Sequence, residues 1–266
     1  MPHDRNIAIL TYHSLDDSGS VLSTAPRLFA DQMQTLYELG LKVVPLSEVQ
    51  HVLDGGAGPK HLVAITFDDG FRSVYEYAVP VLQRYGYTAT VFLVTDYCDR
   101  TNAWPGQPLS IERRPLLRWS EIREMSQSGI AFGSHTRTHP DLRIMTKRDA
   151  EHELVASKKA IEDAIGSAVN VFAYPYGVYD NFTRRLASTH FSLACSATLG
   201  FARSSSDPFA LERIDMYYLQ HPVFFRRLFS TEAHAYISFR RYLRSLRRRA
   251  PQWLDALGLN NLTERI

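Results

Sequence analysis

Two adjacent aspartates directly follow an apolar run in the stretch LVAITFDDGF, residues 62–71. The run predicts a buried strand, so Asp68 and Asp69 fall at the carboxyl end of that strand. Two neighbouring carboxylates repel each other unless a cation or a proton takes up charge, which favours a metal ligand beside a general base. The alternative is structural, because an acid before Gly70 and a helical pattern can simply cap the next helix.

A second stretch with chemical potential is GSHTRTHPDL, residues 133–142, which follows another predicted strand. His135 and His139 are four residues apart, so on a helical turn both rings would share one face and reach one metal ion. Zinc peptidases use this spacing, but Thr136 stands where their motif needs Glu and Pro140 would end the helix, which argues against a peptidase. The structural alternative is a pair of solvated loop histidines.

The elements that must position these residues alternate between apolar runs and helical patterns. Seven runs predict strands, namely residues 7–12, 42–46, 62–67, 88–94, 130–134, 171–176 and 192–198. Helical patterns lie between them; one ends at Gly40, and another is predicted to begin at a Ser47 cap. This alternation implies right-handed crossovers and a mostly parallel sheet, and seven or eight such units favour a barrel over an open sheet.

Closure of a barrel would bring the acids and the histidines together. In parallel α/β folds ligands gather at the carboxyl ends of the strands, where both stretches fall. One aspartate with two histidines leaves coordination positions open for water, as a catalytic divalent-metal site requires. The segment 99–117, rich in Pro and Arg, is predicted to form a loop over one end of the barrel.

The composition bounds the class of protein. With 266 residues, 45% of them hydrophobic, the chain is long enough for one large α/β domain or two small ones. Its net charge of +2 points to no nucleic-acid partner. Cys98 and Cys195 lack metal-type spacing and are interpreted as buried thiols rather than a disulfide. The given chain shows no signal peptide and no bilayer-spanning run, so we expect a cytoplasmic location or a peripheral one at the inner membrane face.

Three short motifs, TFDDG, SHTRTHP and FAYPYG (172–177), occur in this order, each at the end of a predicted strand. With them the sequence resembles the polysaccharide deacetylase family, carbohydrate esterase family 4, with its NodB homology domain. The resemblance covers roughly residues 5–220. It implies an α/β fold with a distorted (β/α)7-type barrel, a divalent metal that is usually zinc, and hydrolytic removal of acetyl groups, most often from glycans that contain N-acetylglucosamine.

The resemblance also implies roles for individual residues of this chain. Asp68 becomes the catalytic base, and its neighbour Asp69 becomes a metal ligand together with His135 and His139. The third motif lies along the substrate groove, where the backbone N–H of Tyr176 helps to hold the oxyanion.

At two positions this sequence departs from the common family pattern. Many relatives begin the third motif with an Arg that pairs with the base, whereas Ala173 stands there in this chain. We expect Arg213, in the stretch LERID, to supply that charge from the next strand, the alternative being a solvated surface arginine. For the general acid we favour His13, in LTYHSL, which resembles the exopolysaccharide N-deacetylases. His221, in YLQH, is the alternative because it matches the Leu-x-His pattern of other relatives.

The chain is divided into a barrel domain, residues 1–222, and a basic helical extension, residues 223–266. The extension carries an apolar stripe formed by Phe239, Tyr242, Leu243 and Leu246, while arginines tend to the other side. One interpretation is peripheral contact with an anionic membrane. The other is that the stripe packs on the barrel and the arginines are solvated.

Taken together, the residues and the resemblance predict a metal-dependent hydrolase that removes N-acetyl groups from a glycan, with zinc as the expected divalent metal. A second hypothesis keeps the barrel and the metal but changes the substrate to a formylated, lipid-linked amino sugar or a small cyclic amide. A third is a catalytically silent glycan-binding module, against which the intact set of Asp68, Asp69, His135 and His139 argues.

Overall fold

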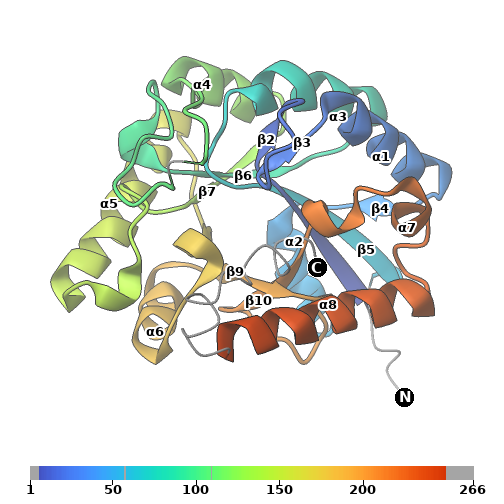
Figure 1. The fold of residues 1–266 in the computed structure, drawn as a ribbon. Helices are drawn as coiled ribbons and strands as arrows, with labels where there is room; N and C mark the ends of the chain where they lie inside the picture. Colours follow the sequence, from blue (N-terminus) through green and yellow to red (C-terminus); the bar gives the residue numbers. More distant parts are fainter. Residues whose placement is uncertain (1–5, 57, 109, 250–266) are drawn as a thin grey trace.

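Seven parallel strands close into a barrel in the computed structural model, which describes residues 6–56, 58–108 and 110–249. In order around the barrel the strands are β1 (Asn6–Tyr12), β10 (Leu211–Asp215), β9 (Leu193–Leu199), β8 (Val171–Ala173), β7 (Ala131–Ser134), β6 (Thr90–Leu93) and β5 (His61–Phe67). Pairing of β1 with β5 along their whole length closes the ring (Figure 1). The predicted (β/α)7-type barrel is thereby confirmed.

One predicted barrel strand was wrong, because residues 42–46 lie outside the ring. Only β4 (Lys42–Val43) forms there, and it pairs with the first half of β5 on the edge whose second half pairs with β6. Pro45, which has no backbone N–H, ends the strand and precedes α2 (Leu46–Leu53). This helix therefore begins without the Ser47 cap that the sequence suggested. The seventh strand of the barrel is instead β10, which was not among the seven predicted runs.

The apolar residues that suggested a strand at 42–46 pack against the end of the barrel instead. Val44 and Leu46 pack with Val49 and Val52 of α2 against inward-facing barrel residues such as Ile9. Helix α2 accordingly lies across the amino end of the barrel (Figure 1). The amino end is closed by this packing, so the open end for chemistry is the carboxyl end.

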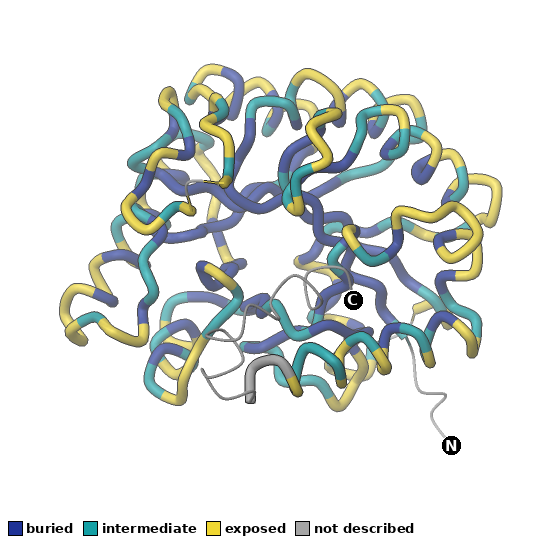
Figure 2. The backbone as a smooth tube through the Cα atoms, viewed as in Figure 1, coloured by how far each residue is buried: buried dark blue, intermediate teal, exposed yellow. Residues whose placement is uncertain are grey.

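Amphipathic helices cover the outside of the barrel. They are α1 (Pro26–Glu38), α3 (Val79–Tyr85), α4 (Trp119–Gln127), α5 (Lys147–Ile165) and α6 (Asn181–His190). Figure 2 shows the barrel strands as buried tube and the outer sides of the helices as exposed. Short segments at the ends of strands complete the fold: β2 (Ser14–Leu15), β3 (Ser23–Thr24), η1 (Val74–Ala78), η2 (Thr95–Tyr97), η3 (Leu142–Ile144), η4 (Pro175–Gly177) and η5 (Met216–Leu219).

The basic extension begins with α7 (Pro222–Arg226) and α8 (Thr231–Arg249). Phe225, Leu228 and Ile237 are buried in the same apolar cluster as β1 and β5. These helices therefore pack on the barrel through their own apolar residues. The proposed division at residue 222 stays a prediction, and residues 250–266 lie outside the described part of the chain.

Three of the four residues of the apolar stripe predicted on α8 are exposed, while Leu243 is half-buried. Phe239, Tyr242 and Leu246 are 58%, 59% and 44% exposed. Arg240 and Arg244 instead lie over the ring of Tyr218, with guanidinium carbons 4.8 Å and 5.9 Å from the ring centroid. The alternative in which this stripe packs on the barrel was thus wrong for these three residues. Within the described residues no helix is long and apolar enough to cross a membrane.

Both cysteines are free and buried, as expected. Cys195 is fully enclosed on β9, and burial raises the pKa of its thiol to about 12. A thiol that stays protonated at neutral pH is neither a nucleophile nor a metal ligand. Cys195 is therefore not a candidate for the catalytic or metal-binding chemistry of this chain.

Candidate metal centre and active site

The first predicted acid, Asp68, is buried against an arginine. It follows β5 directly, and both carboxylate oxygens accept hydrogen bonds of 2.7 Å from the two terminal nitrogens of Arg213 on β10. The Nε–H of Arg213 donates to the carbonyl of Ser196, which fixes the plane of the guanidinium. The two side chains are each 5% exposed. Arg213 thus occupies the place beside Asp68 that Ala173 leaves open, and it is not a surface residue.

This ion pair determines the charge state of Asp68. Burial alone raises the pKa of its carboxyl group, but the charge and hydrogen bonds of Arg213 outweigh burial and hold the pKa well below its ordinary value. Arg213 is also protonated, because the carboxylate offsets the desolvation of the guanidinium. Asp68 is therefore an ionised acceptor whose side chain is held in one orientation.

Asp69 points away from this pair because the backbone turns sharply after β5. Its φ of +69° and that of Gly70, +72°, lie in the left-handed region, which Asp tolerates better than most residues. Burial, the largest influence, raises the pKa of the Asp69 carboxyl group. A buried carboxylate of this kind is stabilised when a cation lies beside it.

The two histidines lie on the loop that follows β7, next to Asp69. One oxygen of Asp69, Oδ1, is 3.5 Å from the Nε2 atom of His135 and 3.5 Å from the Nε2 atom of His139. The three side chains are buried, and one ligand atom from each lies within 4.8 Å of the others. Residues separated by 66 positions in the sequence thus converge on one point at the carboxyl end of the barrel.

The geometry of this group fits a divalent metal ion. Two ligand atoms at bond lengths near 2.1 Å in tetrahedral geometry lie about 3.4 Å apart, close to both separations from Asp69. The Nδ1–H of His135 donates to the carbonyl of Ala173 at 2.7 Å, which leaves Nε2 with a free lone pair directed at the site. His139 has no hydrogen-bond partner at its buried Nδ1 atom among the described residues.

The protonation state of His139 also supports a role as a metal ligand. Burial, with a smaller contribution from His135, lowers the pKa of His139 well below its ordinary value. The imidazole is therefore neutral at physiological pH, as a metal ligand must be. One carboxylate oxygen and two imidazole nitrogens form a donor set that suits zinc, and three protein ligands leave a position open for water.

The third motif and the segment 99–117 form the surroundings of His139. The ring of Tyr176 on η4 lies 4.6 Å from the His139 ring, edge to face, and is 44% exposed. Tyr176 has a φ of +57°, in the left-handed region. Trp104 covers another side of His139, with ring centroids 4.6 Å apart, and is 3% exposed.

Trp104 is a residue that the sequence analysis did not single out. It packs with Phe71, Val94 and Leu116 in a small apolar cluster beside the site. The signal available in the sequence was an isolated Trp in an otherwise polar segment that follows a barrel strand. The segment 99–117 does lie over one end of the barrel, and Leu117 N–H donates to the carbonyl of Gly70 at 2.8 Å.

The two candidates for the general acid lie in different places. His13 stands between β1 and β2, half-buried, directly after Tyr12, whose carbonyl accepts a hydrogen bond of 2.9 Å from the Asp68 N–H. His221 is exposed at the start of α7, where its Nδ1 atom accepts a hydrogen bond of 3.3 Å from the Val223 N–H. The structure therefore brings His13 to the acids and uses His221 as a helix cap.

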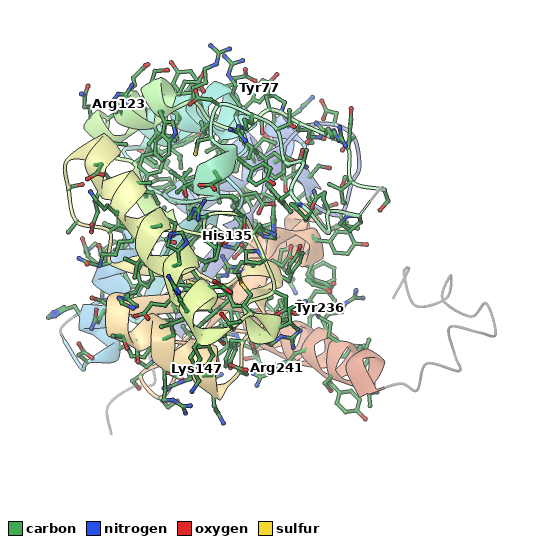
Figure 3. The ribbon with its side chains drawn as sticks, turned by 90° about the vertical axis from the view of Figure 1, so that its left-hand side faces the viewer. Tyr77, Arg123, His135, Lys147, Tyr236 and Arg241 are labelled. Atoms are coloured by element: carbon green, nitrogen blue, oxygen red, sulfur yellow. The ribbon has the colours of Figure 1, made fainter. Side chains whose placement is uncertain are left out.

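A hollow at the opposite end of the barrel offers no comparable chemistry. It has a volume of about 350 Å³, lies near the amino ends of β6, β7 and β8, and includes Thr90, Ala131 and Val171 in its lining. None of its lining residues is titratable. In Figure 3 the label of His135 lies beside α5, apart from the labels of Tyr236 and Arg241 of α8.

Comparisons with known proteins agree with this geometry. The family model described as polysaccharide deacetylase matches residues 55–190. YxkH of Bacillus subtilis (strain 168), whose name places it among the polysaccharide deacetylases, is 30% identical over 210 residues, 78% of this chain and 70% of that protein. The poly-β-1,6-N-acetyl-D-glucosamine N-deacetylase of Staphylococcus epidermidis is 28% identical over 209 residues, 68% of each chain.

A solved structure gives the same result for the fold. The Streptococcus pyogenes deacetylase PplD in complex with acetate superposes with a TM-score of 0.71. It is 26% identical to this chain and covers 80% of this chain and 92% of its own. The resemblance read from the three motifs is therefore confirmed.

Proposed function

Because this chain belongs to the polysaccharide deacetylase family, we propose that it is a zinc-dependent hydrolase that removes N-acetyl groups from an N-acetylated glycan. The observation that carries the proposal is the buried group of Asp69, His135 and His139 beside the ionised Asp68. Two relatives support the substrate class: one is named for poly-β-1,6-N-acetyl-D-glucosamine, and the other was solved with acetate, the acid that deacetylation releases.

In this proposal each residue has one task. A divalent ion held by Asp69, His135 and His139 would supply positive charge that polarises the acetamido carbonyl and makes a nearby water more acidic. Asp68 accepts the proton of the attacking water, because its carboxylate is ionised and each oxygen has a lone pair left beside its bond to Arg213.

The remaining steps use groups on the other sides of the site. As the carbonyl oxygen gains negative charge, the backbone N–H of Tyr176 donates a hydrogen bond to it. The C–N bond then breaks, and His13 gives a proton to the departing nitrogen. Water and the amide are thus converted to acetate and a free amino sugar.

Removal of the metal tests this function directly. We expect the purified protein to release acetate and free amine in equal amounts from an N-acetylglucosamine oligomer. Release should stop after treatment with a chelator and return when zinc is added, because three of the proposed groups act only through a bound ion. Ion chromatography for acetate and a fluorescent amine label measure both products. Unchanged release from metal-free protein would rule out the proposal, and formate from a formamido sugar with no acetate from any glycan would favour the deformylase alternative.

A leaving-group comparison tests His13. We expect His13→Ala to lower kcat on the N-acetylated oligomer by about 10²- to 10⁴-fold, the usual contribution of a general acid. Activity on p-nitrophenyl acetate should change little, because this leaving group departs without a proton. His221→Ala is the control and should resemble the wild type on both substrates. If the His221 variant, and not the His13 variant, showed the substrate-dependent loss, the assignment would be reversed.

We also propose that α8 touches an anionic lipid surface through Phe239, Tyr242 and Leu246. Support comes from their exposure on one face of a helix that carries several arginines, an arrangement typical of interfacial helices. Changing the three residues to Ser should abolish co-sedimentation with phosphatidylglycerol vesicles, whereas Tyr37→Ser, at an exposed aromatic on α1, should not. Deletion of the whole extension is unsuitable because it would remove the buried Phe225 and Ile237. If all variants co-sedimented with the vesicles to the same extent as the wild type, membrane contact through these three residues would be ruled out.

A further inference from the structure

We propose that Glu153, on α5, is a positioning residue that holds the loop between His135 and His139 in its metal-ligating conformation. The inference rests on the proposed metal site. Glu153 does not reach the ligand atoms, and it acts through the two residues that separate the histidines. Figure 3 shows α5 running past His135.

The contacts of Glu153 are concentrated on that loop. Its Oε2 atom accepts hydrogen bonds from the backbone N–H groups of Arg137, at 2.8 Å, and Thr138, at 2.9 Å. Its Oε1 atom accepts the hydroxyl of Thr138 at 2.9 Å. One side chain therefore satisfies two backbone donors and a hydroxyl of the segment that joins the two proposed ligands.

No ion pair explains the burial of this carboxylate. Glu153 is 5% exposed, and within the described residues it takes part in no ion pair. The guanidinium of Arg137 turns away from it to Asp96 on η2, with a nitrogen-to-oxygen distance of 2.6 Å. A buried carboxylate is unfavourable unless it is well hydrogen-bonded. The three hydrogen bonds from the loop are what stabilise Glu153 in this position.

The loop needs such support because its backbone is strained. Thr136 and His139 have φ values of +71° and +59°, in the left-handed region that is unfavourable for residues with a Cβ atom, and most of all for a β-branched one. Conformations of this kind persist only where surrounding contacts determine them. Arg137 and Thr138, the residues that Glu153 binds, lie between the two strained positions.

A second contact from α5 supports the other end of the loop. Ser157, one helical turn beyond Glu153, is hydrogen-bonded through its hydroxyl to that of Ser134 at 2.6 Å. The Ser134 hydroxyl oxygen in turn accepts the N–H of Thr136 at 3.3 Å. Since Leu154 and Ile161 fix α5 in the core, the helix provides a rigid support for both ends of the segment.

Two substitutions at residue 153 separate contact from charge. Glu153→Asp keeps the charge but is one methylene too short to reach the loop. Glu153→Gln keeps the reach: its oxygen can accept the two N–H groups, and its amide can donate to the Thr138 hydroxyl. We therefore expect Glu153→Asp to raise the Kd for zinc by about 10- to 100-fold, the usual effect of losing a partner that orients a metal site. Glu153→Gln should stay near the wild-type value.

The measurement is zinc affinity by competition with a chelating dye, together with the Tm of the metal-free protein. Glu162→Asp is a matched control, because Glu162 also lies on α5 and accepts a backbone N–H, that of Val169 at 2.9 Å, away from the histidines. The control should lower the Tm at most and leave the Kd for zinc unchanged. Should Glu153→Asp fail to fold, Thr138→Val, which removes only the hydroxyl contact, is measured in its place and should raise the Kd.

The outcomes distinguish this inference from the function on which it rests. Wild-type protein that binds no zinc contradicts the proposed function. Wild-type protein that binds zinc, with an unchanged Kd in Glu153→Asp or Thr138→Val, overturns only the role of Glu153 and leaves it a structural residue. A Glu153→Gln variant as weak as Glu153→Asp overturns it as well, because hydrogen bonds of the right reach would then not be enough to hold the loop.

Discussion

Asp68→Asn should lower kcat for acetate release by about 10²- to 10⁴-fold, the range expected when a general base is lost. Its affinity for zinc should stay near that of the wild type, because the carboxylate of Asp68 is bound to Arg213 and does not belong to the ligand group. The neighbouring substitution, Asp69→Asn, should show the opposite pattern. It removes a charged ligand and should therefore weaken zinc binding by more than the roughly 10- to 100-fold caused by losing an outer partner.

The two variants are compared at equal concentrations of folded, zinc-loaded protein. This control is needed because Asp68→Asn leaves the buried guanidinium of Arg213 without its counter-charge and so lowers stability as well. Circular dichroism gives the folded fraction, and dye competition gives the Kd for zinc. Loss of zinc binding in Asp68→Asn, or full zinc binding in Asp69→Asn, would contradict the division of tasks between the adjacent acids.

The site was predictable where its residues follow recognisable strands. The runs before Asp68 and before His135 are mainly apolar, so their carboxyl ends could be located from the sequence alone. Because parallel strands of a barrel end at one rim, the acids and histidines were expected to meet there. The separation of 3.5 Å from Asp69 to each histidine is consistent with this expectation.

The seventh strand was harder to predict because β10 carries charges where other barrel strands carry apolar residues. Its sequence, LERID, contains only two apolar residues, Leu211 and Ile214; the other three are Glu212, Arg213 and Asp215. A buried Arg is stable there only because Asp68, 145 positions earlier, lies opposite. No window of sequence contains both residues. By contrast, 42–46 looks like a strand because it is mainly apolar, but Val44 and Leu46 are buried among residues of α2 and the barrel interior.

Periodicity also could not determine which face of α8 is buried. A helix with an apolar stripe usually turns that stripe to the core. Here the guanidinium groups of Arg240 and Arg244 lie over the ring of Tyr218 on η5, while Phe239 and Tyr242 are exposed. The sequence pattern identified the stripe, but the neighbour that decides its orientation comes from another part of the chain. Glu153 was missed for a related reason, since a Glu on an amphipathic helix is ordinarily solvated.

The largest effect on stability is expected from Arg213→Met. Removing one partner of a buried ion pair leaves an uncompensated charge, and this costs about 3–5 kcal/mol of unfolding free energy near neutral pH. Arg184→Met is a matched control, because Arg184 pairs with Asp207 at the partly exposed surface. Loss of that pair should change stability by no more than about 1 kcal/mol. Urea denaturation of metal-free protein measures both.

The effect of Arg213→Met should depend on pH with a definite sign. In the wild type the pKa of Asp68 is lowered on folding, so its stabilising contribution is present above the unfolded pKa, near 3.9, and is lost only as the pH falls through the lower folded value. In the variant burial is no longer opposed by Arg213, so the folded pKa rises above 3.9 and a penalty develops as the pH increases. The difference between the two proteins should therefore be small in strong acid and grow towards neutral pH.

A double-mutant cycle completes the argument for the pair. In Asp68→Asn/Arg213→Met neither charge remains, so the double variant should be more stable than the sum of the single effects predicts, because no buried charge is left unpaired. Its stability should also lose the pH dependence that the single Arg213 variant shows between acid and neutral solution. Two results would mean that the guanidinium does not set the ionisation of the proposed base. One is that the single effects on the free energy of unfolding are additive; the other is that Arg213→Met lowers this free energy by the same amount at all pH values.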